Sequence, residues 1–128
     1  MNENNLLELK KDIFYRATLF IEDMGEFSPF GSELLENEIK PVMIFDDAEE
    51  VSKGVKWIDI LIDSFSKKIF NNEIQAGAIA YDVSANFKNA DGVYEKRDAL
   101  CLKISTDGES WSEEYFPYMV IEGKCIWS

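Results

Sequence analysis

Aspartate and glutamate are the most abundant reactive side chains in this sequence. There are 25 of them against 13 lysines and arginines, and the chain contains no histidine. Histidine is the usual general base, proton carrier and transition-metal ligand. Its absence disfavours catalysis, although carboxylates, cysteine, lysine and tyrosine could still act. The composition therefore favours a binding protein over an enzyme.

Several acidic residues are close enough in the sequence to act in pairs. Paired carboxylates could bind magnesium or calcium, or divide the roles of acid and base as in glycosidases. None of these pairs has the spacing of a known calcium loop, and acids at the start of a helix are explained by capping and by the helix dipole. We therefore predict no metal and no cofactor. The pairs are Asp46 with Asp47, Glu49 with Glu50, Glu113 with Glu114, and Asp59 with Asp63.

Two further aspartates interrupt stretches that otherwise have the pattern of strands. Asp82 lies within an alternating segment, and Asp98 has the same parity as Leu100. A carboxylate in such a position either lies at the mouth of the strand or enters the core, where it needs a cation or backbone donors. A buried ion pair or a turn cap is the structural interpretation. The functional alternative is a pocket beside the sheet, formed by Tyr81, Asp82, Asp98 and Tyr118.

The C-terminal half contains many aromatic residues that could anchor a partner. From Trp111 to Tyr118 they fall on both faces of the expected strand. Both faces cannot face solvent, so helices or a partner must cover the second one. Tryptophan and tyrosine are typical anchors of interfaces, although core packing accounts for most aromatic side chains. The predicted partner-binding residues are Asp46, Asp47, Glu49, Glu50, Trp111, Glu113 and Glu114.

Hydrophobic periodicity predicts two amphipathic helices. Apolar residues recur every three or four positions from Asn4 to Met24, and Gly25 provides a stop. The same spacing recurs from Val51 to Ile69. Asp46 and Asp47 are expected to cap this second helix.

Alternating patterns between turn residues predict six strands. Short turns join the last four, so these must pair antiparallel as a meander. The predicted fold is therefore α+β and occupies residues 1–128 as a single domain: a helix, a two-strand hairpin, a second helix and a four-stranded antiparallel meander, with both helices on one face of the sheet. The predicted strands are Leu34–Leu35, Ile39–Phe45, Ala76–Phe87, Ala99–Ser105, Trp111–Val120 and Lys124–Trp127.

Charge and hydropathy also limit the classes of partner and the location of the protein. A net charge of −12 repels the phosphates of nucleic acids and attracts basic proteins. No apolar run approaches the roughly 20 residues of a membrane span, and the N-terminus lacks an export signal. We therefore expect a cytoplasmic protein in which Cys101 and Cys125 are buried free thiols.

Four short fragments resemble a pattern in small, mostly uncharacterised bacterial proteins of similar length. They are Phe27–Gly31, Ala78–Val83, Asp98–Leu100 and Phe116–Tyr118, with the letters FSPFG, AIAYDV, DAL and FPY. Some proteins of this kind resemble immunity proteins, the acidic inhibitors that block a toxin made by the same cell. The resemblance implies protein binding without an established activity, and it assigns no site residues.

Three functions are compatible with these observations. The leading one is a non-enzymatic binding protein, of the immunity or antitoxin type, that opposite charge steers onto a basic enzyme. The second is a small-molecule-binding or metal-dependent enzyme that uses Asp82 and Asp98, which requires side chains within hydrogen-bond reach of one another. The third is a self-associating scaffold that adds Lys124–Trp127 to the sheet of another chain.

Overall fold

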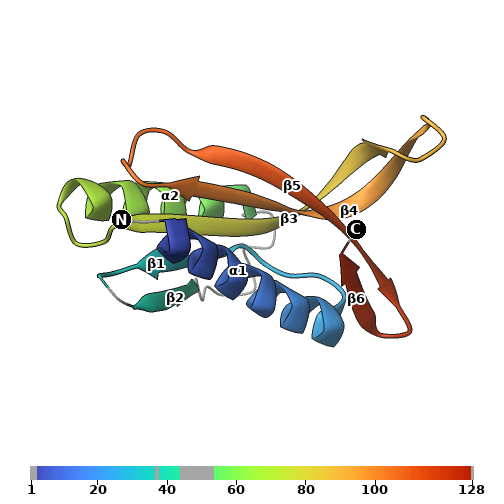
Figure 1. The fold of residues 1–128 in the computed structure, drawn as a ribbon, viewed down its shortest axis with the longest axis horizontal. Helices are drawn as coiled ribbons and strands as arrows, with labels where there is room; N and C mark the ends of the chain where they lie inside the picture. The colour runs from blue at the N-terminus through green and yellow to red at the C-terminus, as the bar shows by residue number, and fades with distance from the viewer. Residues whose placement is uncertain (1–2, 37, 44–53, 128) are drawn as a thin grey trace.

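A six-stranded antiparallel sheet with a helix on each face forms the part of the chain that the computed structural model describes, residues 3–36, 38–43 and 54–127 (Figure 1). The α+β class predicted from the sequence is therefore confirmed. Neither described helix is long and apolar enough to cross a membrane. In chain order the elements are α1 (Glu3–Met24), β1 (Phe30–Leu34), β2 (Ile39–Met43), α2 (Gly54–Phe70), β3 (Ala76–Lys88), β4 (Tyr94–Ser105), β5 (Ser112–Ile121) and β6 (Lys124–Trp127).

The sheet joins the predicted hairpin and the predicted meander into one structure. Its strand order is β2-β1-β3-β4-β5-β6, and β1 pairs with β3 from Phe30 opposite Ala80 to Leu34 opposite Ala76. The first predicted strand, Leu34–Leu35, overlaps β1 only at Leu34. In the structure the strand begins directly after Pro29 and includes Gly31.

The two helices cover opposite faces of the sheet, so the prediction that both lie on one face is wrong. Alternate residues of β3 explain the arrangement, because neighbours along a strand point to opposite sides. Ala78 and Ala80 belong to the core cluster that contains the buried side chains of α1, whereas Ile79 belongs to the cluster that contains those of α2. Both faces of β3 are apolar or small over this stretch, so each can accept a helix.

Helix α1 packs on one face of the curled sheet, and the last strand packs against it. Four of its apolar residues are buried, with exposures of 0 or 1%. The ring of Phe14 makes edge-to-face contacts with Phe116 and Trp127, each at 4.9 Å between centroids. The Trp127 indole N–H donates to the Thr18 hydroxyl at 3.0 Å, and the Cys125 N–H donates to the Glu22 carboxylate at 3.0 Å. These contacts hold β6 against the C-terminal half of α1.

Helix α2 packs through Phe65, whose ring lies directly on two glycines of the sheet. A Cβ atom built on Gly77 would lie 2.6 Å from Phe65 Cδ2, and one built on Gly31 would lie 2.8 Å from Phe65 Cζ. Real Cβ atoms do not approach other atoms so closely, so both strands need glycine at these positions. The expected capping residues Asp46 and Asp47, and the start of the predicted helix, lie outside the described residues.

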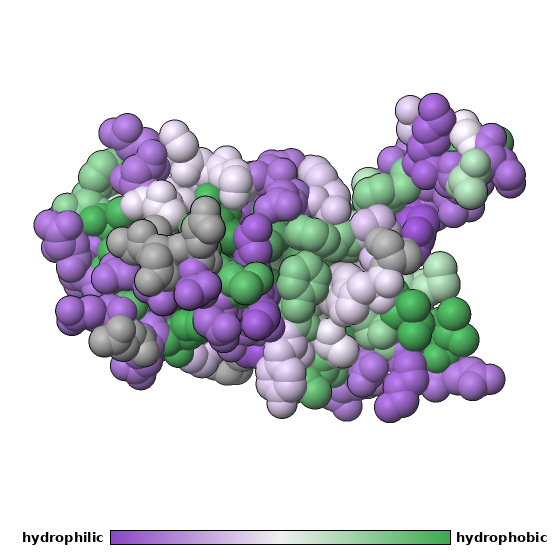
Figure 2. All heavy atoms as spheres, viewed as in Figure 1, coloured by the Kyte–Doolittle hydropathy of each residue, from purple (hydrophilic) through white to green (hydrophobic). Residues whose placement is uncertain are grey.

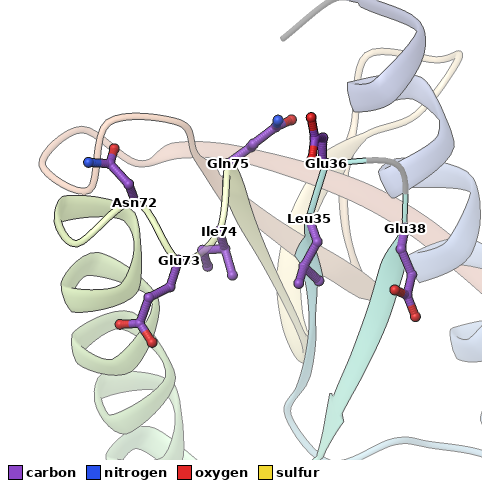
Figure 3. Close-up of a pocket in the computed structure, with 7 residues that line it drawn as sticks. All are labelled: Leu35, Glu36, Glu38, Asn72, Glu73, Ile74 and Gln75. Carbon is purple, nitrogen blue, oxygen red and sulfur yellow. The ribbon is translucent and has the colours of Figure 1, made fainter.

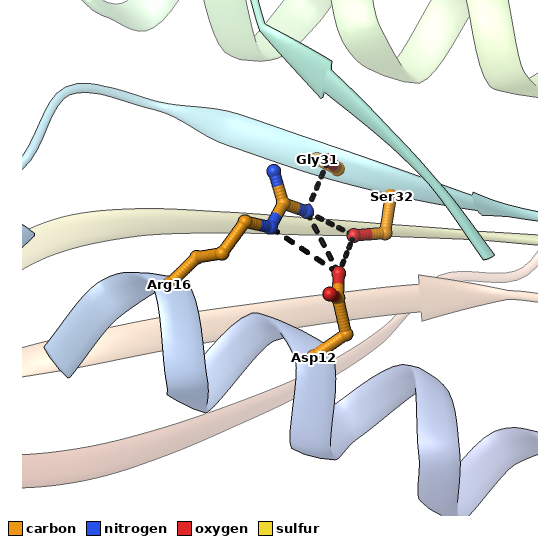
Figure 4. Close-up of polar contacts among 4 residues, drawn as sticks. All are labelled: Asp12, Arg16, Gly31 and Ser32. Carbon is orange, nitrogen blue, oxygen red and sulfur yellow. Dashed lines mark hydrogen bonds and ion pairs between the residues drawn. The ribbon is translucent and has the colours of Figure 1, made fainter. Parts of the chain in front are cut away.

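A buried polar group links α1 to β1 on the other face (Figure 4). Asp12 accepts hydrogen bonds from Arg16 Nη2 at 2.9 Å and from the Ser32 hydroxyl at 2.6 Å. The same Nη2 donates to the Gly31 carbonyl at 2.8 Å and also contacts the Ser32 hydroxyl. The guanidinium lies over the Phe30 ring, 4.8 Å from its centroid.

The sheet divides into two hairpins beyond its centre. Strand β4 pairs with β3 as far as Tyr94 opposite Lys88, but its pairing with β5 stops at Ala99 opposite Pro117. The remainder of β5 pairs with β6 alone. The β3–β4 hairpin and the β5–β6 hairpin therefore diverge, as their separate courses in Figure 1 show.

Candidate functional site

A carboxylate and a phenol meet at the point where the two hairpins diverge. The hydroxyl of Tyr118 lies 2.9 Å from each carboxylate oxygen of Asp82 and donates to this carboxylate. Tyr118 is buried, with 3% of its surface exposed, and Asp82 is half-buried. Asp98 shares this face of the sheet, because it lies opposite Ser84, two residues after Asp82 on β3. It is exposed and lies within β4, four residues after the strand begins at Tyr94, so it neither enters the core nor lies at the strand mouth.

The surroundings of Asp82 disfavour its charge. Burial is the largest cause that raises its pKa from 3.8 to about 6, and the negative charges of Asp98 and Glu26 act in the same direction. Hydrogen bonds from Tyr118 and from the backbone of Phe27 oppose this shift. Burial and the hydrogen bond to Asp82 also raise the pKa of Tyr118, so its phenol stays protonated as a donor.

Acidic residues at the end of α1 enlarge this acidic region. Glu22 and Asp23 lie in its last turn and Glu26 follows Gly25, while no basic residue occupies that turn. The C-terminus of a helix carries partial negative charge, so acids there destabilise the helix and cations would stabilise it. Glu22 also reaches β6 through the Cys125 N–H. The region, which we call the acidic junction, consists of Glu22, Asp23, Glu26, Asp82 and Asp98.

This arrangement has few of the properties of a catalytic or metal site. Asp82 with a pKa of about 6 could exchange a proton near neutral pH, which is the one catalytic property of the site. However, its carboxylate and the Tyr118 hydroxyl are hydrogen-bonded to each other. Within the described ranges, no group of three or more Cys, Asp or Glu side chains is arranged to hold a metal ion.

The predicted pocket is brought together only in part. Asp82, Asp98 and Tyr118 lie on the face that α1 covers, whereas Tyr81 packs with the cluster of α2 on the opposite face. Burial and a hydrogen bond with Cys101 raise the pKa of Tyr81. Cys101 is a buried free thiol as predicted, while Cys125 is a free thiol that is half-buried.

Of the predicted partner-binding residues, Trp111, Glu113 and Glu114 lie in the described part of the chain, and the two glutamates point to opposite faces of β5. Trp111 is half-buried against the cluster of α2. Glu113 lies 2.8 Å from the Lys103 ammonium, and Glu114 lies 3.3 Å from the Lys10 ammonium on the other face of β5. Asp46, Asp47, Glu49 and Glu50 lie outside the described residues. Glu22, Asp23 and Glu26 are not among the residues predicted from the sequence, although three acids around a helix-ending glycine are a visible signal.

Among the hollows on the described surface, two lie away from the acidic junction. One, of about 650 Å³, lies between the end of α2 and the β1–β2 connection and is rich in glutamate (Figure 3). The other, of about 550 Å³, is an apolar groove between α1 and β5. The residues lining this groove are Leu7, Lys10, Lys11, Phe14, Tyr15, Thr18, Glu114 and Phe116.

Comparison with protein-family models, curated proteins and solved structures finds no match for this chain. The resemblance of the FSPFG, AIAYDV, DAL and FPY fragments to small bacterial proteins therefore stays a prediction.

The raised pKa of Asp82 predicts that its charge costs stability as the pH rises. Between 3.8 and about 6 the folded state binds more protons than the unfolded state at this residue, so the free energy of unfolding decreases across that interval. After allowance for solvent screening of a half-exposed group, we expect a loss of about 1 kcal/mol. In urea unfolding from pH 4 to pH 7, this loss should appear as the difference in pH dependence between the wild type and Asp82→Asn.

Tyr118→Phe provides the control for this assignment. It removes a hydrogen bond that holds the pKa of Asp82 down, so the titration of this carboxyl followed by NMR should move to higher pH. Identical pH dependence of unfolding in the wild type and Asp82→Asn would contradict the assignment.

Proposed function

We propose that this chain is a non-enzymatic binding protein whose acidic junction recognises a basic protein. One observation carries the proposal. Glu22, Asp23 and Glu26 lie at the C-terminal end of α1, where the helix dipole disfavours negative charge. Features that weaken local structure without a visible structural gain are typical of functional sites. The exposed Asp23 and Glu26 are of this kind, whereas Glu22 also accepts the Cys125 N–H. A cationic partner would relieve this repulsion together with that between Asp82 and Asp98.

Exposed apolar side chains beside the junction supply contact area for such a partner. On α1, Leu19 is 49% exposed, Tyr15 is 66% exposed and Met24 is 61% exposed. Tyr15 also lines the apolar groove between α1 and β5. Aromatic and apolar anchors inside a charged rim are the usual composition of a protein interface.

The enzymatic alternative is supported less well. Its residues would have to converge on one substrate, but Tyr81 lies on the opposite face of the sheet from Asp82. Asp98 lies within β4 with its side chain exposed. An inhibitor of a basic toxin is the form of the binding function that the resemblance to immunity proteins implies.

The test is a comparison of two double variants with equal changes of charge. Asp23→Asn/Glu26→Gln neutralises the junction, and Asp91→Asn/Glu95→Gln neutralises two exposed acids on the β3–β4 hairpin. Each protein is immobilised and exposed to lysate at low and high salt, and the retained partner is purified and titrated. We expect the junction variant to bind about tenfold more weakly at low salt and the hairpin variant to bind like the wild type.

Two results would contradict the proposal. If both double variants lose affinity equally, binding depends on net charge and not on the junction. If no basic protein is retained by the wild type at low salt, the acidic surface serves solubility alone.

A further inference from the structure

The β5–β6 hairpin exposes apolar side chains that the rest of the described chain does not cover. Met119, Val120, Ile121 and Ile126 are each between 42 and 51% exposed. Figure 2 shows hydrophobic atoms gathered over this hairpin, where it stands away from the body of the molecule. Four adjacent exposed apolar residues on one short ribbon are unusual for a surface that only contacts water.

Three of these residues share one face of the hairpin. Met119 lies opposite Ile126, and Ile121 has the same parity as Met119, whereas Tyr118 and Trp127 point to the opposite face and α1. Tyr115 also has this parity and is 45% exposed. Helix α2 packs on β1 and β3, which the strand β4 separates from β5 and β6 in the sheet. Neither of the described helices therefore covers the face formed by Tyr115, Met119, Ile121 and Ile126, which we call the outer hairpin face.

The charge of this segment differs sharply from that of the chain. From Tyr115 to Trp127 there is one acid, Glu122, and one base, Lys124, whereas the whole chain carries a net charge of −12. A basic partner would find no excess of acid on this segment. Two copies of the chain, which repel each other elsewhere, can approach here without opposing like charges.

We propose that the outer hairpin face is the interface of a homodimer, an inference that goes beyond the binding of a basic protein. A two-fold axis brings the same patch of both copies together, so each contact occurs twice. Met119, Ile121 and Ile126 of one copy pack on those of the other. At the tip, Glu122 of each copy faces Lys124 of its partner, which fixes the orientation of the pair.

The contact uses the face of the hairpin and not its open edge. Although β6 is the last strand of the sheet, the Cys125 N–H already donates to the Glu22 carboxylate at 3.0 Å. Helix α1 thus covers part of this edge, as proteins often do to prevent strand addition. The small area of the face indicates a weak dimer, with dissociation constants on the order of 100 μM.

Sedimentation equilibrium of the full chain over a wide concentration range tests the proposal. The wild type should reach twice the 14.7 kDa mass of one chain. Met119→Thr/Ile126→Thr keeps residues suited to strands but removes apolar surface, and it should raise the dissociation constant at least about tenfold. The control is Val93→Thr/Tyr94→Thr on the β3–β4 hairpin, whose side chains are 59 and 68% exposed. This control should dimerise like the wild type.

A charge exchange at the tip gives a readout that does not depend on the stability of one variant. E122K alone and K124E alone should each dimerise more weakly than the wild type, because each places like charges together. An equimolar mixture should restore a dimer that contains one chain of each kind. Circular dichroism establishes that each variant is folded.

Three outcomes overturn the proposal: a wild type that stays monomeric to about 1 mM, a dimer that the hairpin variants leave unchanged, and a mixture that restores nothing. A monomer that binds vesicles of neutral phosphatidylcholine would assign the same apolar face to a lipid surface instead.

Discussion

Gly77→Ala will destabilise the protein by about 3 kcal/mol, because the added methyl group has no space. Its Cβ would lie 2.6, 2.8 and 2.9 Å from the Cδ2, Cγ and Cβ atoms of Phe65. The clash involves the root of a fully buried side chain rather than its flexible end. Phe65 cannot turn away without leaving Gly31 and Gly77, so α2 itself must move from the sheet. Urea unfolding measures the loss.

A double-mutant cycle with Phe65→Ala separates the clash from other effects of the new methyl group. Phe65→Ala alone should cost about 3–5 kcal/mol through the cavity that it leaves. In that background Gly77→Ala should cost much less, because two of the three close atoms are gone, and the coupling energy should exceed about 1 kcal/mol.

Gly92→Ala is the matched control for the backbone. Gly92 has a φ of +80° and its nearest neighbour would lie 3.7 Å from a new Cβ, so the substitution strains the dihedral without a clash. It should cost about 1 kcal/mol. A Gly77→Ala cost no larger than that of Gly92→Ala would contradict the packing of Phe65 on β3.

Asp12→Ala will lower the free energy of unfolding by about 2–3 kcal/mol, because it removes the carboxylate that pairs with the mostly buried Arg16 guanidinium. The side chains of Arg16 and Asp12 are 14 and 28% exposed, and Asp12 also accepts from the buried Ser32 hydroxyl. Removal of one partner of such a group is more damaging than removal of both. Asp12→Ala/Arg16→Met should therefore be more stable than Asp12→Ala alone.

A second ion pair with the same helical spacing supplies the comparison. Asp63 and Lys67 lie 3.0 Å apart on α2, with side chains 68 and 72% exposed. Asp63→Ala should change the free energy of unfolding by less than about 0.5 kcal/mol. Equal costs for Asp12→Ala and Asp63→Ala in thermal or urea unfolding would show that burial adds nothing to the α1 pair.

The elements of this fold could be predicted from periodicity, but their assembly could not. The predicted helix from Asn4 to Met24 agrees with α1 within one residue, and the last strand agrees with β6. Alternation along Ala76–Ala80 identified two faces without showing which helix covers each. The strand that begins at Phe30 could not be predicted from local sequence, because its Gly31 is required by a contact with Phe65, which is distant in the sequence.

The candidate site was predictable to a similar degree. Asp82 and Asp98 stand out in the sequence because each interrupts a strand pattern, and in the structure they share a face of the sheet. Tyr81 could have been excluded, because neighbours along a strand point apart. The acids at the end of α1 were overlooked because sequence rules for helix ends search for residues that stabilise them, and Glu22 and Asp23 do the opposite.

The attachment of β6 to α1 also governs how the chain reaches this structure. The bonds from Cys125 to Glu22 and from Trp127 to Thr18 join residues 103 and 109 positions apart. During synthesis, α1 emerges long before the strand that completes its surroundings. Its apolar surface stays partly uncovered until these distant residues have been made, and the closure carries the entropy cost of so long a loop. The packing of the last strand on the first helix thus gives this fold a high contact order.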